Sequence, residues 1–328
     1  MKLILAVSIS ILLFLVLFII YVTNVNLASH ERKFNAFILK YKKDYLYNSP
    51  EYNKRLSIFK NNLKEQERLN SENGEDVYGI TKFSDLTQDE FVKKLLTKMS
   101  YFKMDNTVTS VPSNVKLLKK VDWRKYVGRP RDQKACGGCW AFATIKGVEA
   151  INSKKVGKFT QLSIQEVIDC SRGFKESLWG CEGGNICSAM DWLQNKHISI
   201  TTESSYPLKD ADEECKRTSS TSGIKLTKYI CGAGEDFLKT SLQKGPVAVA
   251  VDAASWIHYA NGIIKFHCDK QLNHAVLVVG YDMEGEVPHY LVQNSWGNDW
   301  GEDGYLKIRM DKGLCGIDQQ IGLVEDVK

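Results

Sequence analysis

The chain has 328 residues, 43% of them apolar, so it can bury a full core and form two or three domains. Its 44 basic and 39 acidic residues leave a net charge of +5, without a long basic run. Because this excess is small and dispersed, it argues against a protein that binds nucleic acid, and no nucleic-acid partner is expected.

The first residues form an apolar segment behind a single lysine. The uncharged run from Leu3 to Val22 is longer than the roughly 7–15 apolar residues of a secretory signal and close to the roughly 20 that span a bilayer. We expect residues 1–28 to be either a signal peptide, cleaved near Ala28, or an uncleaved signal-anchor and the chain's membrane contact. With Lys2 on the cytoplasmic side, both alternatives place the rest of the chain in an oxidising lumen.

The region before residue 121 is charged, helical and free of cysteine. In SPEYNKRLSIFKNNLKEQERLNSENG, Ser49 is a candidate N-cap, Pro50 takes the first helical position and Gly74 follows the end. YGITKFSDLTQDEFVKKLL predicts a strand-like stretch and a second helix whose N-cap is Asp85 or Thr87. A polar segment between residues 99 and 120 is typical of a linker. The first helix has an apolar stripe, formed by Leu56, Phe59, Leu63 and Leu69.

Beyond Val121 the composition shifts to glycine, tryptophan and cysteine. Residues from about 139 to 225 predict helices and long loops, whereas GPVAVAVDAA, HAVLVVGYD, HYLVQNSW and GYLKIRM predict strands. This rear part is therefore expected to have a helical half followed by a β-rich half. All nine cysteines lie in it, and their odd number leaves at least one thiol unpaired.

Cys136 and Cys139 form a Cys-x-x-Cys pair at the start of a predicted helix. Such a pair can be a redox dithiol, half of a zinc site, or a reactive thiol beside a disulfide half. The small α/β context of a redox dithiol is missing, and no second close pair has zinc-site spacing. A cysteine in the first helical turn lies at the positive end of the helix dipole, which favours a thiolate. The third interpretation is favoured, and no metal or cofactor is expected.

Two downstream blocks support that interpretation. CGGCW is followed by LNHAVLVVGY with His274 and by VQNSWGNDWGEDGY with Asn294, at about the 130–150-residue separations of the papain and cathepsin signature. With VDWR, LSIQEVIDCS, GCEGG, SYPL and GPVAVAVDA, these motifs make the chain from about residue 121 resemble papain-like cysteine proteases. The runs GIIKFHCDKQLNHAVLVVGY and VPHYLVQNSWG are most similar to the cathepsins of insect large DNA viruses, with invertebrate cathepsin L or F types next.

The front part resembles the inhibitory propeptide of the same family. Its helix pattern, Glu-x3-Arg-x3-Phe-x2-Asn-x3-Ile-x3-Asn, is matched except that Gln66 replaces the isoleucine. A second pattern, Gly-x-Asn-x-Phe-x-Asp, has Thr81 in place of asparagine. The matching residues are Glu51, Arg55, Phe59, Asn62 and Asn70 in the first pattern, and Gly79, Phe83 and Asp85 in the second.

The resemblance implies residues 29–112 as propeptide and residues 113–328 as mature peptidase domain. The propeptide would run through the cleft opposite to the direction of a substrate. Acid would loosen the carboxylate contacts of Glu51 and Asp85 and permit self-cleavage between about Thr107 and Lys120.

An α+β, two-domain papain-like fold is also implied, with a helical left domain, a β-barrel-like right domain and the active-site cleft between them. Cys139 would be the nucleophile, His274 its partner in a thiolate–imidazolium pair, and Asn294 the residue that orients the imidazole. Gln133 and the Cys139 N–H would form the oxyanion hole. Trp296 would cover the contact between His274 and Asn294.

Substrate choice would depend on the pocket for the residue two before the cut. The resemblance gives it walls of Ile186, Ala253 and Leu272 and a floor at Gln320, which favour Leu, Val or Phe. Gly183 and Gly184 would let the substrate backbone approach closely. No histidine-rich insertion follows GCEGG, so an endopeptidase is expected.

Three disulfides are implied by the resemblance: Cys136–Cys181, Cys170–Cys215 and Cys268–Cys315. Cys187 and Cys231 have no family partner, and they either form a fourth bridge or remain free. Two residues depart from the family near the nucleophile. Gly138 replaces a serine or alanine, and Lys134 replaces a glycine. We hypothesise that the Lys134 charge lowers the pKa of the Cys139 thiol.

Expected partners are protein and peptide substrates, the chain's own propeptide and cystatin-type inhibitors, with the protein a monomer. We expect passage through the endoplasmic reticulum to a lysosome-like compartment or to the outside. The competing interpretation is a non-catalytic papain-fold binding protein. Such relatives usually lose the nucleophile, whereas all four catalytic candidates are present in this chain.

Overall fold

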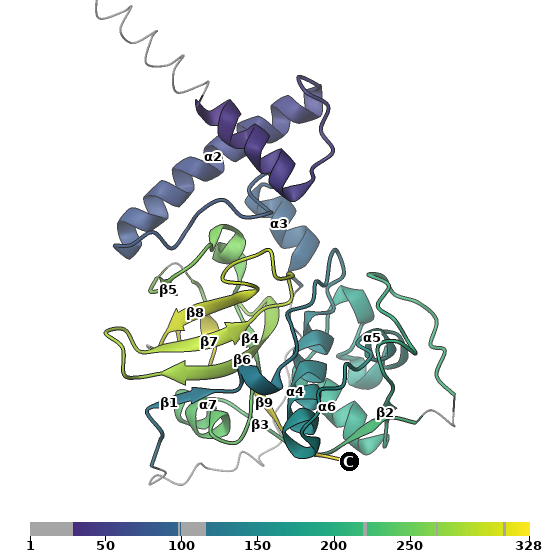
Figure 1. Cartoon of the computed structure of the whole chain (residues 1–328). Coiled ribbons are helices and arrows are strands. Elements are labelled where there is room, and N and C mark those ends of the chain that lie inside the picture. Colours follow the sequence, from purple (N-terminus) through teal and green to yellow (C-terminus); the bar gives the residue numbers. More distant parts are fainter. Residues whose placement is uncertain (1–28, 98, 100–115, 219–221, 267, 311–312) are drawn as a thin grey trace, which may run out of the picture.

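The computed structural model describes residues 29–97, 99, 116–218, 222–266, 268–310 and 313–328. The expected signal segment and most of the expected processing region lie outside these residues. Within the described residues, no helix has the length and apolar character needed to cross a membrane. Figure 1 shows a helical front part above a body in which most helices lie on one side and most strands on the other.

The front part contains a helix over residues 29–41, then α2 (Pro50–Asn73) and α3 (Gln88–Leu95). The predicted caps of α2 are confirmed, because the Ser49 side chain accepts from the Tyr52 N–H and Gly74 ends the helix at φ 78°. Of the two candidate N-caps of α3, the structure uses Thr87, in a capping box with Glu90. The stretch before α3 is mostly turns, with one bridge between Tyr78 and Tyr259, so the strand expected there is wrong.

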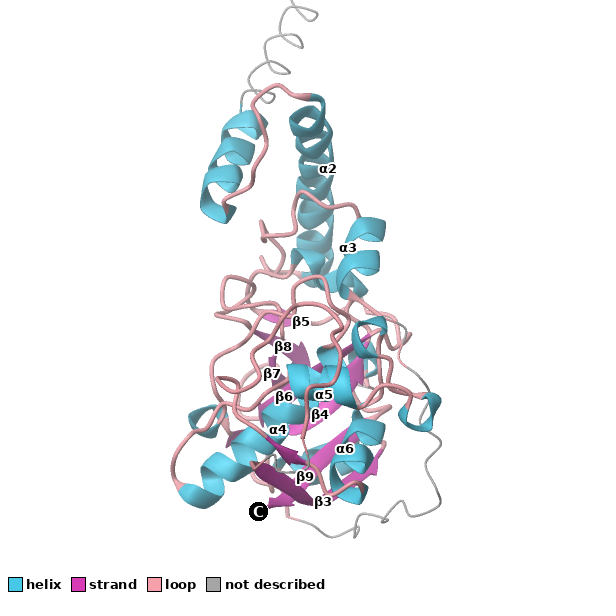
Figure 2. Ribbon diagram, turned by 90° about the vertical axis from the view of Figure 1, so that its right-hand side faces the viewer, coloured by secondary structure: helices cyan, strands magenta, loops and turns pink. Residues whose placement is uncertain are grey.

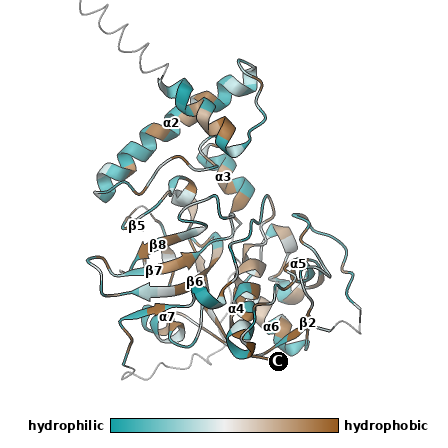
Figure 3. Cartoon of the chain, viewed as in Figure 1, coloured by the Kyte–Doolittle hydropathy of each residue, from teal (hydrophilic) through white to brown (hydrophobic). Residues whose placement is uncertain are grey.

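The helix over residues 29–41 crosses α2, and the two share an aromatic cluster (Figure 1). α2 itself is largely hydrophilic along its length (Figure 3), so this cluster supplies most of its apolar contact. We call residues 29–73 the arm. Its cluster comprises Phe34, Phe37, Tyr52, Leu56, Phe59 and Leu63.

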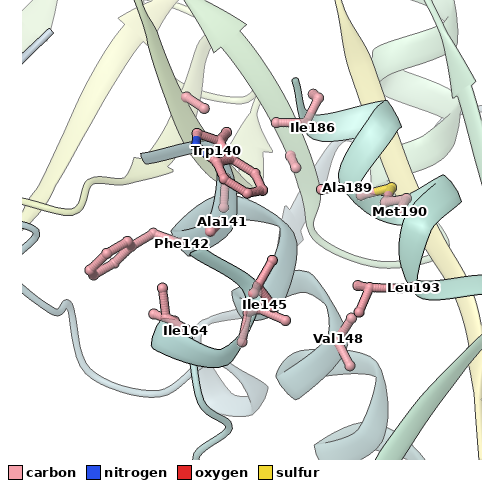
Figure 4. Packing of buried hydrophobic residues seen from close by; sticks show 14 of the residues in the cluster. Trp140, Ala141, Phe142, Ile145, Val148, Ile164, Ile186, Ala189, Met190 and Leu193 are labelled. Atoms are coloured by element: carbon pink, nitrogen blue, oxygen red, sulfur yellow. The ribbon is translucent and has the colours of Figure 1, made fainter. Parts of the chain in front are cut away.

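The left domain contains α4 (Cys139–Val156), α5 (Gln165–Cys170), α6 (Ile186–Asn195) and the short strand β2 (Ser199–Ile200). α4 is buried on all sides from Cys139 to Ser153, which explains why its apolar residues show no single stripe. Figure 4 shows Trp140, Ile145 and Val148 of α4 packed toward Met190 and Leu193 of α6.

The right domain is a sheet with one helix, α7 (Glu235–Leu242). The strand order is β2-β3-β9-β4-β6-β7-β8-β5, with β1 (Lys120–Asp122) paired to β6. This path has two ends, so over the described residues the β-barrel-like right domain that we expected is an open sheet and not a closed barrel. Figure 2 shows the strands and α4 packed together below the front part. The other strands are β3 (Ile224–Gly232), β4 (Val247–Val251), β5 (Ile263–Ile264), β6 (His274–Asp282), β7 (His289–Gln293), β8 (Tyr305–Arg309) and β9 (Ile321–Val327).

Four disulfides connect the described residues: Cys136–Cys181, Cys170–Cys215, Cys187–Cys231 and Cys268–Cys315. The question left open for Cys187 and Cys231 is thereby answered, since they join α6 of the left domain to β3 of the right domain. Among the described cysteines only Cys139 is free, and it is buried.

Candidate active site

Cys139 is the first residue of α4 and is completely buried. The loop before it is fixed by the Cys136–Cys181 disulfide and by a hydrogen bond from the Gly137 N–H to the Cys181 carbonyl, 2.9 Å. The departure at Gly138 has a local reason, because a Cβ there would lie 2.8 Å from Cδ1 of Ile168. The isoleucine side chain fills the space that a serine or alanine would need.

His274 begins β6, and its Nε2 lies 2.8 Å from Oδ1 of Asn294. The same Oδ1 accepts the Ser295 N–H at 2.8 Å, which fixes the orientation of the Asn294 amide. Because Oδ1 can only accept, Nε2 carries the proton and Nδ1 keeps its lone pair. Nδ1 is buried and has no hydrogen-bond partner among the described residues.

Trp296 covers this contact. Its ring stacks on the His274 imidazole with centroids 4.8 Å apart and an interplanar angle of 27°. Burial lowers the pKa of His274 to about 4, although the hydrogen bond with Asn294 acts in the opposite direction. The imidazole is therefore neutral in this covered state.

The Cys139 sulfur lies close to the start of β6, where the backbone N–H of Ala275 interacts with it. Burial raises the pKa of the thiol to about 11. The Ala275 N–H, the Thr97 hydroxyl and the N–H groups of the first turn of α4 act against that rise. With the cleft covered, burial thus favours the neutral forms of both Cys139 and His274.

Gln133 lies beside the nucleophile, with its amide orientation fixed. Its Oε1 accepts the Ser295 hydroxyl at 2.5 Å, so its Nε2 faces the cleft. Nε2 donates to two carbonyls, that of Cys136 at 3.0 Å and that of Leu95 at 3.1 Å. Leu95 is the last residue of α3, so a carbonyl of the front part occupies the donor that we expect to serve the oxyanion hole.

The chain after α3 continues along the cleft. The Thr97 N–H donates to the Asn273 carbonyl at 2.9 Å, and the Met99 N–H to the Leu272 carbonyl at 3.4 Å. Met99 is buried in the apolar cluster that contains Ile186, and Leu272 packs against that cluster. Leu95, Thr97 and Met99 therefore cover, in turn, Gln133, the surroundings of Cys139 and the expected pocket for the residue two before the cut.

The remaining pocket residues come from separate segments. Ala253 is buried, and its N–H donates to Oδ1 of Asn273 at 2.9 Å. Gln320 is half-buried, and its carbonyl accepts the Ala250 N–H. Ala253 belongs to the apolar cluster within the right domain, whereas Ile186 belongs to the cluster that packs the left-domain helices against β4, β6 and β9, so the expected pocket lies where the two clusters meet.

Gly183 and Gly184 have structural reasons to be glycine. Gly183 adopts φ 125°, and a Cβ on Gly184 would lie 2.5 Å from the Trp140 indole. Trp179 was not predicted from the sequence. Its backbone N–H donates to the Gly183 carbonyl at 2.8 Å, and the residue is 47% exposed. The place of this tryptophan directly before the GCEGG motif was the available signal.

The Lys134 side chain is close to a carboxylate. Lys134 is exposed and its Nζ lies 3.2 Å from Oδ2 of Asp132, so a carboxylate compensates much of the charge that we expected to act on Cys139.

Ser295, which orients Gln133, was also not predicted from the sequence. The signal for it was its place directly after Asn294 in the NSWG motif.

The chain matches two family models. Residues 117–324 match the papain family cysteine protease, and residues 34–91 match the cathepsin propeptide inhibitor domain. Cathepsin O of Homo sapiens is 37% identical over 82% of this chain and 87% of its own length. The viral cathepsin of Adoxophyes honmai nucleopolyhedrovirus is 35% identical over 88% of this chain and 89% of its own length.

Solved proenzymes have the same fold. Digestive procathepsin L 3 of the Tenebrio molitor larval midgut superposes with a TM-score of 0.76 at 33% identity, covering 90% of this chain and 98% of that one. A recombinant stem bromelain precursor gives a TM-score of 0.77 at 31% identity, covering 90% and 98%. The chain belongs to the papain family of cysteine proteases. It is a cysteine endopeptidase synthesised as a zymogen, with its inhibitory propeptide in front of the peptidase domain.

Proposed function

We propose that Cys139, His274, Asn294 and Gln133 perform peptide-bond hydrolysis in the mature enzyme. The observation that supports this proposal is the arrangement around His274. Its Nε2 is hydrogen-bonded to Asn294, its Nδ1 has no partner among the described residues, and the neighbouring Ala275 N–H reaches the Cys139 sulfur. Nε2 thus fixes the orientation of the imidazole, and Nδ1 is available to accept a proton from a thiol.

The reaction follows from these positions. Once the cleft opens, the Cys139 proton moves to Nδ1 of His274, and the thiolate adds to the substrate carbonyl carbon. The oxyanion takes the Gln133 N–H that the Leu95 carbonyl occupies in the zymogen, together with the Cys139 N–H. The C–N bond then breaks, and the leaving amine takes the proton from the imidazolium. Water hydrolyses the thioester and regenerates the thiol.

The pocket formed by Ile186, Ala253, Leu272 and Gln320 would favour an apolar residue two before the cut. The buried Met99 side chain in the zymogen supports this preference, since an apolar side chain already lies in the adjoining cluster. Gly183 and Gly184 would bind the substrate backbone, and Trp179 would flank it.

We further propose residues 29–112 as the segment removed and residues 113–328 as the mature enzyme, with a leader or anchor at residues 1–28. Passage through the secretory pathway to an acidic compartment or to the outside, a monomeric state and sensitivity to cystatin-type inhibitors complete the proposal. N-terminal sequencing of the purified active form would test the segment boundaries.

An epoxysuccinyl thiol reagent tests the catalytic assignment. After acid activation, mass spectrometry should find one label, on Cys139, and hydrolysis of a fluorogenic peptide should stop in proportion to labelling. The matched variants are Cys139→Ala, which should lose both, and Gln133→Ala, which should keep labelling but lose roughly 10²–10³-fold in kcat. An activated protein that takes up no label would instead support a non-catalytic binding protein.

A further inference from the structure

The propeptide places one lysine on two carboxylates of the peptidase domain. Nζ of Lys82 donates to Oδ2 of Asp132 at 2.8 Å and to Oδ1 of Asp299 at 2.9 Å. The Lys82 side chain is only 13% exposed. Its neighbour Phe83 lies edge-on against Trp296, with ring centroids 5.6 Å apart. The lysine is therefore seated beside the tryptophan that covers His274.

The backbone around Trp296 leaves room for this ammonium group. Asp132 and Trp296 form an isolated β-bridge, and the Gly297 N–H donates to the Arg131 carbonyl at 2.9 Å. Gly297 has φ 78°, and a Cβ on it would lie 2.9 Å from Oδ1 of Asp299 and 3.2 Å from Nζ of Lys82. Glycine at this position thus leaves space for a cation to contact both carboxylates, and we call this space between Asp132, Gly297 and Asp299 the cradle.

Maturation removes Lys82 together with the propeptide. Burial acts to raise the pKa of Asp132, but Lys82 and then Lys134 outweigh burial and lower it. When Lys82 leaves, the exposed Lys134 is the one ion-pair partner left to Asp132 among the described residues, and Asp299 loses its ion pair with Lys82. A largely buried carboxylate that loses a partner favours a new cation. The Trp296 face that Phe83 and Phe91 cover also becomes accessible.

The order of contacts along the propeptide places this cradle relative to the cut. Lys82, Phe83 and Phe91 lie at Asp132, Asp299 and Trp296, before Leu95 reaches Gln133. Thr97 and Met99 follow at Asn273 and Leu272, next to the expected pocket for the residue two before the cut. The cradle therefore lies on the other side of the oxyanion donor, where the leaving-group part of a substrate binds.

We propose that Asp132 and Asp299 form a specificity subsite for a lysine or arginine within the first three residues after the cut, and that Lys82 stands in for this side chain in the zymogen. The inference rests on the proposed catalytic function. In such a substrate the ammonium or guanidinium group contacts the two carboxylates, and the aliphatic stem lies along Trp296.

Internally quenched peptides with leucine two before the cut test the proposal. Lysine is compared with norleucine at the first, second and third positions after the cut, using the matured enzyme. We expect kcat/KM to favour lysine at one position by about fivefold or more, as for a partly buried ion pair, and the preference to decrease with added salt. The Asp132→Asn/Asp299→Asn double variant should lose this preference while cleaving the norleucine peptide at the wild-type rate.

Asp236→Asn, an exposed carboxylate on α7, is the matched control and should leave the preference unchanged. If Asp132→Asn reduces folding, Asp299→Asn alone, at an exposed position, should still reduce the preference. No lysine preference at any of the three positions, or one that persists in the double variant, would overturn the subsite. Active-site titration and cleavage of the norleucine peptide report the catalytic proposal separately, so the two can fail independently.

Discussion

The two parts of the propeptide contact the enzyme in different ways. The arm, residues 29–73, buries its aromatic side chains against one another. Residues 77–97 instead place Val77, Tyr78, Phe83 and Phe91 in the apolar cluster of the right domain, together with Trp296. Most apolar side chains of the arm thus form a core of their own, although Leu69 near its end belongs to the right-domain cluster, and the following segment shares the core of the enzyme. The side chains that stabilise the fold of the arm are therefore largely distinct from those that close the cleft.

The carboxylates that we expected to respond to acid have their charged partners in the propeptide itself. Asp85 is bound by Lys43 and by the Tyr45 hydroxyl, and Glu51 by Arg55. The Arg55 guanidinium also donates to Oε2 of Glu90 at 2.7 Å. These contacts join the arm to α3. Their loosening in acid stays a prediction, and it would act on the propeptide before it acts on the cleft.

The largest effect on closure should come from Phe91→Ala. Phe91 is fully buried, with its ring 5.3 Å from that of Trp296. Truncating a buried phenylalanine costs about 3–5 kcal/mol, so labelling of Cys139 in the intact proenzyme should accelerate at least about 100-fold at neutral pH. The measurement is the initial rate of the mass shift by the epoxysuccinyl reagent. A change below about fivefold would mean that the shared core does not hold the cleft closed.

Acid should open the proenzyme through His258, at the end of a 3₁₀ turn in the right domain. Its Nδ1 lies 3.3 Å from Nε2 of Gln66 on α2, beside a cavity of about 650 Å³ that is also lined by charged side chains. Burial lowers the pKa of His258 from 6.5 to about 4, while Glu65 acts to raise it. The other charged residues that line the cavity are Arg68, Asp252 and Asp269.

The lowered pKa of His258 determines how closure of the cleft depends on pH. An opened His258, back near 6.5, binds a proton more tightly than the closed one, so closure is complete above about pH 6.5 and weakens as the pH falls toward 4. Across that window the labelling rate should rise by up to about 100-fold more in the wild type than in His258→Gln. Identical pH profiles for the two proteins would exclude His258 as the sensor.

A smaller effect is expected in the arm. Phe59→Ala removes a ring that lies 5.2 Å from both Phe34 and Phe37. It should lower the free energy of unfolding of the arm by about 3–5 kcal/mol. The Cys139 labelling rate should rise only about tenfold, because local opening of the arm leaves Phe83, Phe91 and Leu95 in place. Hydrogen exchange of α2 measures the first effect, and an acceleration equal to that of Phe91→Ala would contradict the separation of the two parts.

The smallest effect is expected for Gln66→Ile, which restores the residue of the family pattern. It loses one hydrogen bond to His258, worth about 1 kcal/mol, and gains buried apolar surface that offsets the loss. The labelling rate at neutral pH should change by less than about fivefold in either direction. A much faster rate would show that this polar contact, rather than the shared core, holds the arm on the enzyme.

Local signals predicted the ends of α2 and the strands β4, β6, β7 and β8, because capping residues and apolar runs act over a few positions. β9 was not predicted. It contains Gly322, against which Met190 of α6 packs, and its charged end is paired with Lys155 and Lys244. A strand whose partners are supplied by distant elements has no such local signature.

The candidate site shows the same limit. The position of Cys139 in the first turn of a helix favoured a reactive thiol, but its pairing with His274 could be inferred only from resemblance, since nothing in either neighbourhood predicts that the two meet. The Leu95 carbonyl on Gln133 had no sequence signal at all, because every residue carries a carbonyl. Lys82 lay between two recognised positions of the propeptide pattern, yet its partners are 50 and 217 residues away in the sequence.

The disulfide between Cys187 and Cys231 has a consequence for the integrity of the mature enzyme. The other three bridges each close within one side of the connection between the helical and the β-rich halves, and this bridge spans it. A peptidase that nicks the backbone between residues 216 and 230 would therefore produce two chains that stay joined. They would migrate as one band on a non-reducing gel and separate only when a reductant is added.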